Sequence, residues 1–386
     1  MSNRSSKLPD VGTTIFTVIS RRAEELGAVN LGQGFPDYPI DPRLTGLVTV
    51  AMQAGHNQYA PMPGLPALQT LIAADISRRH GVVIEPQRSV TITLGATEAI
   101  FSAVLALVGA GDEVLVFDPA YDSYDPAVRL AGARCVHVPL LPPAFAYDWD
   151  RVRAAVNKRT RMVIINSPHN PACTVMSRED LDQLASIAEA HDLLVLSDEV
   201  YEHIVYAPVR HHSVLSHAGL RERALAVFSY GKSLHATGLR VGYCVAPPML
   251  TTELRKVHQF NTFTIATAFQ HAIAAYLDET PDVFTRLPGF FERKRALLAV
   301  GLADSAFRVL PAQGTYFTLV DYSRCELLAG LDDQAAATRL LEQVGVASIP
   351  LTPFYREPIR HSLLRLCFAK QDATLEKAIA RLRACR

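Results

Sequence analysis

Short apolar, β-branched runs alternate with longer helical patterns between about residues 88 and 245 of the chain. Several of these runs are apolar almost throughout, which is typical of strands that helices cover on both faces. The expected strands are Val90–Leu94, Glu113–Asp118, Arg134–Val138, Arg161–Asn166, Leu193–Ser197, Leu225–Phe228 and Val241–Ala246. Helices are expected between them, such as Ser177–His191, where Ser177 and Asp180 have the spacing of a capping box. The alternation predicts an α/β domain with a mostly parallel sheet between helices.

The pattern changes beyond about residue 250, where a smaller α+β domain is expected. Two long helical segments come first, at roughly Leu250–Leu277 and Phe284–Ser305. They lead to shorter strands and a final helix, expected at Phe307–Leu310, Tyr316–Val320, Val346–Pro350, Leu363–Cys367 and from about Thr374. The first forty residues are too few and too rich in glycine and proline to fold alone. We therefore predict an N-terminal arm (1–42) that packs on the small domain and the substrate site, a large domain (43–283) and a small domain (284–386).

The composition of the chain excludes several classes of protein. Of 386 residues, 49% are hydrophobic and 20% are charged, which excludes an intrinsically disordered chain. Lys plus Arg and Asp plus Glu both number 38, so no net charge draws the chain to nucleic acid or a membrane surface. The most apolar stretch, Ala99–Ala110, is too short to span a bilayer and predicts a buried helix. The opening residues lack the apolar core of a secretory signal, so a cytoplasmic protein is expected.

Several familiar sites are absent from the sequence. The six cysteines lie far apart without a C-x-x-C pair, which predicts reduced thiols and no metal site. The dinucleotide fingerprint G-x-G-x-x-G does not occur. Gly231-Lys232-Ser233 imitates the end of a P-loop, but the first glycine of that motif would fall at Ala226, inside an expected strand. No phosphate-binding loop of that kind is therefore expected.

Polar groups nevertheless gather at the ends of the expected strands. Lys232 follows one strand, and Arg240 comes eight residues later. A lysine at a buried strand end can be desolvated, which lowers its pKa and makes it a competent Schiff-base nucleophile. An arginine nearby can bind a phosphate with its planar guanidinium group. Taken alone, this pair could equally be a lysine with its stem on the surface and a solvated arginine.

Three further clusters lie at comparable positions. Gly95-Ala96-Thr97 joins a strand to a helix whose N-terminus suits an anion. Asn170 precedes Pro171 just beyond another strand, either in an ordinary turn or presenting its amide to a ligand. Asp198 and Tyr201 end a third strand, and a buried carboxylate there needs a cationic or strongly donating partner. Ligands of open α/β sheets bind outside the carboxyl ends of the strands, so these groups predict one shared crevice.

The ordered series from Gly95-Ala96-Thr97 through Asn170-Pro171, Asp198–Tyr201, Ser229–Lys232 and Arg240 to Arg365 resembles the class I pyridoxal-phosphate aminotransferases of fold type I. The resemblance covers nearly the whole chain and is greatest to bacterial methionine aminotransferases and the related kynurenine/glutamine aminotransferases. Supporting stretches are Gly34-Phe35-Pro36-Asp37, Asn57-Gln58-Tyr59-Ala60-Pro61, Tyr121-Asp122-Ser123-Tyr124 and Gly314-Thr315-Tyr316-Phe317. It implies an aspartate-aminotransferase-like fold and the cofactor pyridoxal 5′-phosphate.

The resemblance also implies a role for each site residue. Lys232 would bind the cofactor as a Schiff base and then carry the proton between substrate and cofactor. Asp198 would pair with the pyridine nitrogen, Tyr201 and Asn170 would bind the phenolic oxygen, and Tyr121 would stack on the ring. The cofactor phosphate would be held by Ala96, Thr97, Ser229, Arg240 and the partner subunit's Tyr59. The substrate α-carboxylate would be held by Gly34, Asn170 and Arg365. Active sites shared in this way imply a homodimer.

The expected reaction is transfer of an amino group from methionine, an aromatic amino acid or glutamine to a 2-oxo acid. No second arginine is evident for a side-chain carboxylate, and Phe16, Phe35, Tyr38 and Tyr59 would favour an apolar or aromatic side chain, unless they only pack the arm. An alternative with the same cofactor is a carbon–sulfur β-lyase. A non-catalytic regulator with an aminotransferase-like domain is disfavoured, because only about forty residues precede the large domain, without a basic helix-turn-helix pattern.

Overall fold

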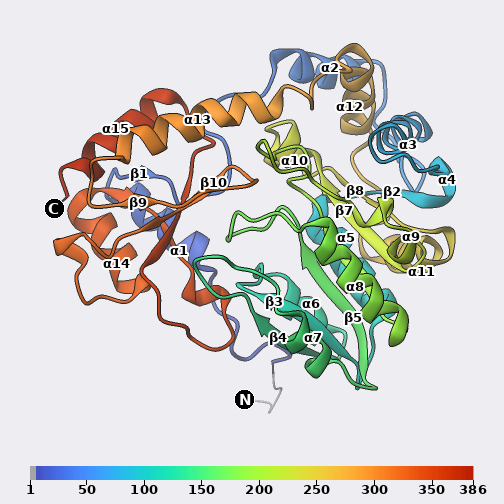
Figure 1. Cartoon of the computed structure of the whole chain (residues 1–386). Helices are drawn as coiled ribbons and strands as arrows, with labels where there is room; N and C mark the ends of the chain where they lie inside the picture. The colour runs from blue at the N-terminus through green and yellow to red at the C-terminus, as the bar shows by residue number, and fades with distance from the viewer. Residues whose placement is uncertain (1–5, 386) are drawn as a thin grey trace, which may run out of the picture.

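The computed structural model describes residues 6–385, which build a seven-stranded sheet, a four-stranded sheet and a two-stranded sheet with their helices (Figure 1). The larger sheet has seven strands in the order β2-β8-β7-β6-β5-β3-β4. These strands are β2 (Val90–Thr93), β3 (Glu113–Asp118), β4 (Arg134–Pro139), β5 (Thr160–Asn166), β6 (Leu194–Asp198), β7 (Ala224–Ser229) and β8 (Gly242–Val245). Strands β4, β3, β5, β6 and β7 pair in parallel, and β8 runs antiparallel to β7 and β2. The prediction of a mostly parallel sheet is confirmed.

Helices cover both faces of this sheet. They are α3 (Pro66–His80), α4 (Pro86–Ser89), α5 (Gly95–Leu107), α6 (Tyr124–Leu130), α7 (Trp149–Ala155), α8 (Arg178–Ala190), α9 (Ala218–Arg221), α10 (Tyr230–Ser233) and α11 (Pro248–Asn261), with 3₁₀ turns at Val214–Ser216 and Thr237–Leu239. Alternate residues of a strand face opposite layers. Val114 and Val116 of β3 pack with α5, α6 and α11, whereas Leu115 and Phe117 join α3, α7 and α8. The expected capping box of Ser177 and Asp180 begins α8.

The smaller body is built on a four-stranded antiparallel sheet in the order β12-β13-β10-β9. Its strands are β9 (Arg308–Val309), β10 (Phe317–Asp321), β12 (Ile349–Pro350) and β13 (Leu363–Cys367). Helices α13 (Leu287–Leu302), α14 (Asp333–Arg339) and α15 (Asp372–Arg383) accompany it, with shorter turns at Glu326–Leu328, Leu340–Val344 and Thr352–Phe354. The expected switch from a parallel to an antiparallel arrangement is thus present.

The N-terminal segment packs against this smaller body. After α1 (Ile15–Glu25), strand β1 (Val29–Asn30) pairs in parallel with β11 (Val346–Ala347). The carbonyl of Leu31 accepts a hydrogen bond from the N–H of Cys367 at 2.7 Å. Farther on, α2 (Pro42–Gln53) packs on α12 (Thr267–Glu279) at the upper edge of Figure 1. The division at residues 42 and 283 stays a prediction.

Two expected elements are wrong in their extent. The helix expected over 250–277 is two helices, because α11 ends where Phe263 takes a φ of +71° and its N–H bonds back to the carbonyl of His258. The intervening Thr262–Thr264 are β-branched or aromatic residues of low helix propensity. The strand expected over 346–350 is also divided, since β11 pairs with β1 and β12 pairs with β13. Among the described residues, no helix has the length and apolar character needed to cross a membrane.

Candidate active site

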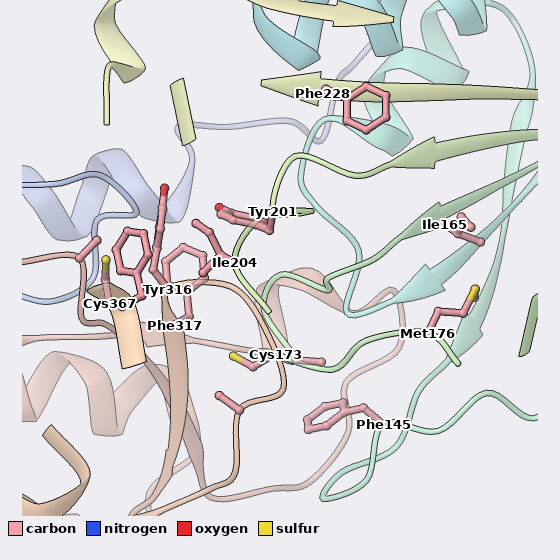
Figure 2. Close-up of a cluster of buried hydrophobic side chains, with 14 of the residues drawn as sticks. Phe145, Ile165, Cys173, Met176, Tyr201, Ile204, Phe228, Tyr316, Phe317 and Cys367 are labelled. Carbon is pink, nitrogen blue, oxygen red and sulfur yellow. The ribbon is translucent and has the colours of Figure 1, made fainter. Parts of the chain in front are cut away.

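The predicted site residues gather around one cavity of about 230 Å³ at the carboxyl ends of β5, β6 and β7. Every predicted residue except Tyr59 lines it: Gly34, Ala96, Thr97, Tyr121, Asn170, Asp198, Tyr201, Ser229, Lys232, Arg240 and Arg365. The smaller body closes it from the other side through β10 and β13, which carry Phe317 and Arg365. Figure 2 shows Tyr201, Ile204, Tyr316 and Phe317 together where the two bodies meet. The expected crevice is therefore present.

Lys232 lies on α10, three residues after β7 ends at Ser229. Its Nζ donates to the carbonyl of Gly34 at 3.4 Å and lies 5.7 Å and 5.8 Å from the ring centres of Tyr201 and Tyr316. Removal from water disfavours the charged amine and lowers the pKa of Lys232 to about 8. The neutral amine, which is the nucleophilic form, is therefore accessible near neutral pH.

Asp198 is a buried carboxylate at the end of β6. The hydroxyl of Tyr124 donates to its Oδ2 at 2.7 Å, and the N–H of Val200 donates to Oδ1 at 3.4 Å. Burial raises the pKa of Asp198 to about 6 despite these donors. Lys232 attracts the Asp198 carboxylate from a distance, but no arginine or lysine among residues 6–385 forms an ion pair with it, so its environment suits a cationic ring nitrogen brought by a ligand.

The N-terminus of α5 forms a cup with Arg240. Gly95 has a φ of +70°, and a Cβ on it would lie 2.7 Å from a terminal nitrogen of Arg240. The guanidinium group thus lies directly over the glycine. One of its terminal nitrogens donates a hydrogen bond to the carbonyl of Thr237 at 3.1 Å. Ala96, Thr97 and Ser229 line the same part of the cavity. Helix N–H groups, hydroxyls and a guanidinium group together suit a phosphate.

Arg365 is buried on β13 and faces the cavity from the opposite side. Its terminal nitrogens donate to Asn170 Oδ1 at 2.6 Å and to the carbonyl of Gly32 at 2.7 Å. The guanidinium carbon lies 4.0 Å from the ring centre of Phe317 and 5.2 Å from that of Phe16. Its Nε is buried and has no hydrogen-bond partner among residues 6–385. A donor left unsatisfied in this way suits an anionic ligand.

Tyr59 is the one predicted site residue that the cavity of its own chain does not include. Its side chain is 82% exposed and lies edge-on against Phe263, with ring centres 5.2 Å apart. Gly34, unlike Tyr59, lines the cavity of its own chain, and its backbone packs closely on Phe317. A Cβ on Gly34 would lie 2.8 Å from the ring of Phe317. The carbonyl of Gly34 accepts from the hydroxyl of Tyr316 at 2.6 Å.

Sequence reasoning missed Tyr124 as a site residue. Its hydroxyl makes the shorter of the two hydrogen bonds that the Asp198 carboxylate accepts among the described residues, although 74 residues separate the two side chains. Tyr124 begins α6 three residues after Tyr121, and the two rings are 5.8 Å apart. The only signal in the sequence is this spacing of two tyrosines, which does not reveal which carboxylate the second one meets.

The chain matches the family "Aminotransferase class I and II" over residues 27–382. It is 47% identical over 378 residues to the methionine aminotransferase of Escherichia coli, covering 98% of this chain and 97% of that protein. A probable N-succinyldiaminopimelate aminotransferase of Mycobacterium tuberculosis is 40% identical over 389 residues, and a mouse kynurenine–oxoglutarate transaminase is 32% identical over 410, each covering 98% of this chain and 97% of the relative. The crystal structure of an Escherichia coli protein assigned a methionine aminotransferase function superposes with a TM-score of 0.96, at 46% identity and complete coverage of both chains.

The chain therefore belongs to the class I and II aminotransferases. It is an enzyme of pyridoxal-phosphate-dependent amino acid transamination with the aspartate-aminotransferase-like fold, as the sequence predicted. The residues of the cavity also fit this cofactor. The cavity combines the Lys232 amine of lowered pKa, the buried Asp198 carboxylate of raised pKa and the anion-binding cup at Arg240.

Proposed function

We propose that the protein transfers the amino group of methionine, or of an aromatic or amide-bearing L-amino acid, to a 2-oxo acid. The observation that carries the proposal is the lining of the cavity. Among the described residues that line it, the cationic ones are Lys232, Arg240 and Arg365. In the proposed mechanism Lys232 binds the cofactor, Arg240 binds its phosphate and Arg365 binds the substrate α-carboxylate. None of the three is then left to bind a carboxylate on the substrate side chain. Phe16, Ile100 and Phe317 supply apolar surface instead, which favours an uncharged side chain.

In this proposal Lys232 binds the cofactor covalently and later holds the proton that leaves the substrate α-carbon. Bound pyridoxal phosphate supplies an electron-accepting ring for the pair of electrons that the proton leaves behind. Asp198 keeps the ring nitrogen protonated, and Tyr124 orients the Asp198 carboxylate. The raised pKa of Asp198 is consistent with a site completed by that cation, because a positive ring would return the carboxyl group to its charged form.

Binding is divided between the two bodies of the protein. Ala96, Thr97, Ser229 and Arg240 hold the phosphate, Tyr121 covers the ring, and Asn170 and Tyr201 bind its phenolic oxygen. Arg365 pairs with the substrate α-carboxylate, with Asn170 and the backbone of Gly34 beside it. The support for Arg365 is its unsatisfied Nε and the two aromatic rings that hold its plane.

We also propose a homodimer in which Tyr59 reaches the phosphate of the other subunit. Tyr59 and Phe260 are 82% and 84% exposed, and Phe263 lies against Tyr59. Such aromatic exposure is costly in water and is typical of a surface that a second copy covers. A cytoplasmic location belongs to the same proposal.

The test is an amino-donor screen with purified protein against several 2-oxo acids, in which the keto acid products are identified. Methionine, phenylalanine and glutamine should be converted, and aspartate and N-succinyldiaminopimelate should be poor donors because their side chains carry a carboxylate. Preference for a dicarboxylic donor would overturn the substrate proposal. Pyruvate and ammonia released from a cysteine S-conjugate without any 2-oxo acid would favour the β-lyase alternative.

Replacing Tyr124 with phenylalanine should lower kcat/KM about tenfold to a hundredfold for every donor, since one hydrogen bond to a charged, buried carboxylate is lost. Tyr355→Phe is a matched control, because it removes a buried hydroxyl that bonds the carbonyl of Leu140 away from the cavity. Steady-state kinetics of both variants check this prediction. Equal activities of the two would leave Tyr124 without a role in the site.

Covalent capture of pyridoxal phosphate by the apoenzyme should accelerate with pH up to about 8 and level off above it. Only the neutral amine attacks, and its fraction grows about tenfold per pH unit below a pKa and saturates above it. The pKa of Lys232 is about 8, so the plateau begins there. Stopped-flow absorbance of the cofactor from pH 6 to 10 measures the rate. A rate still rising tenfold per unit at pH 9.5 would show an ordinary lysine.

A further inference from the structure

A second cluster of reactive side chains lies at the β4 edge of the large sheet, outside the active-site cavity. Strand β4 is the edge strand, beside α6 and α7 (Figure 1). Cys135 and His137 are two residues apart on β4 and therefore face the same way. Asp125 of α6 faces them, and one ligand atom from each of the three side chains lies within 4.8 Å of the others.

We propose that Asp125, Cys135 and His137 bind a zinc ion. A thiolate, an imidazole and a carboxylate form a ligand set that zinc accepts, with a water molecule completing the tetrahedron. Neighbouring ligand atoms in such a tetrahedron are about 3.3–3.8 Å apart, given metal–ligand distances of roughly 2.0–2.3 Å. Asp125, Cys135 and His137 are all only partly buried, which leaves their side chains room to turn toward a shared ion.

An independent observation is the way in which His137 is held. Its Nδ1 shares a hydrogen bond of 2.8 Å with Oδ1 of Asp118, which is buried at the end of β3. The other carboxylate oxygen of Asp118 accepts from the N–H of Arg356 at 2.8 Å. Histidines that bind metals commonly donate one ring N–H to a carboxylate in this way, which directs the other nitrogen to the ion. Nε2 of His137 has no hydrogen-bond partner among residues 6–385.

The main competitor for the site is Arg129, which donates to Oδ2 of Asp125 at 3.1 Å. Arg129 also forms an ion pair with Asp10, so it keeps a partner when Asp125 turns to the metal. Arg129 and the three proposed ligands line one surface hollow of about 940 Å³, through which a hydrated ion can enter. Burial, with Asp125 adding to it, raises the pKa of the Cys135 thiol, so zinc must displace that proton and should bind more tightly at higher pH.

Such an ion would fasten α6 to the sheet edge one residue from Tyr124. The sequence predicted no metal site, since the ligands come from a helix and a strand and form no spaced motif.

Zinc binding to the holoenzyme by equilibrium dialysis tests the proposal. We expect one zinc ion per chain, affinity lowered more than about a hundredfold in Cys135→Ser and His137→Asn, and lowered about tenfold to a hundredfold in Asp118→Asn. His191→Asn, a change of an exposed histidine at the end of α8, is the matched control and should bind like the wild type. Zinc-edge X-ray absorption of the wild type should show one sulfur ligand at about 2.3 Å.

Failure of the wild type to bind zinc stoichiometrically, or a first shell without sulfur, would overturn the proposal whatever the variants do. Binding that persists in both Cys135→Ser and His137→Asn would also overturn it and place the ion elsewhere, for example at Glu199, Glu202 and His211 or on the cofactor. Melting temperatures without zinc establish that each variant is folded.

Discussion

Lys232→Ala is expected to lower kcat by at least about 10⁴-fold while the protein still binds pyridoxal phosphate without a covalent bond. The change removes both the nucleophile and the proton carrier, and a positioned acid–base group alone contributes about 10²–10⁴-fold. The anion cup at Gly95 and the carboxylate of Asp198 remain, so the cofactor keeps its noncovalent contacts. Single-turnover kinetics and equilibrium cofactor binding measure the two effects separately.

Borohydride reduction of the wild type provides the control for this result, because it fixes the cofactor to the amine that holds it. Peptide mapping by mass spectrometry should find the adduct on Lys232 and nowhere else. Lys256→Ala, which alters an exposed lysine of α11, should be fully active. An adduct on another lysine, or turnover by Lys232→Ala within tenfold of the wild type, would show that the catalytic amine had been assigned wrongly.

Arg365→Lys should lower kcat/KM by roughly thirtyfold to a thousandfold for every amino donor and every oxo acid, mainly through KM. A planar guanidinium group can meet both oxygens of an α-carboxylate, whereas an ammonium group offers one point charge on a flexible stem. The loss of such a pair at a desolvated site costs on the order of 2–4 kcal/mol. Lysine also cannot keep the bonds to Asn170 and Gly32 together with the contact with Phe317.

The pattern across substrates decides what this result means. Methionine, phenylalanine and glutamine share the α-carboxylate, so their ratios of kcat/KM should change little. Arg255→Lys is the matched control, because Arg255 is another arginine with two hydrogen bonds, to Thr91 and Val90, away from the cavity. A penalty confined to one donor would show that Arg365 reads a side chain, and another group would then have to hold the carboxylate.

The large sheet could be predicted because of how it is buried. Strands covered on both faces must be apolar almost throughout, so each stands out in the sequence and ends visibly where a polar residue such as Asp198 appears. The carboxyl ends of parallel strands meet at one edge, which allowed residues as distant as Asn170 and Lys232 to be assigned to one cavity.

Contacts between side chains from different elements could not be predicted in the same way. Nothing in the local pattern joins Tyr124 to Asp198, because their meeting depends on how α6 packs on the sheet. The break after Asn261 also depends on tertiary structure, since an apolar periodicity continues into α12 while the backbone at Phe263 turns left-handed. Val346–Pro350 is continuous in sequence, but the partners β1 and β13 divide it.

The pairing of β1 with β11 has a consequence for the order in which the chain can fold. During synthesis the N-terminal segment emerges first, but the strand that it pairs with lies more than 300 residues later. Val29 and Leu31, both buried in the finished protein, must therefore wait in contact with solvent or chaperones until β11 and β13 have left the ribosome. Closing so long a loop is slow. The hydrogen bond from Arg365 to the carbonyl of Gly32 also forms at that late stage. An incomplete nascent chain therefore cannot assemble the substrate site.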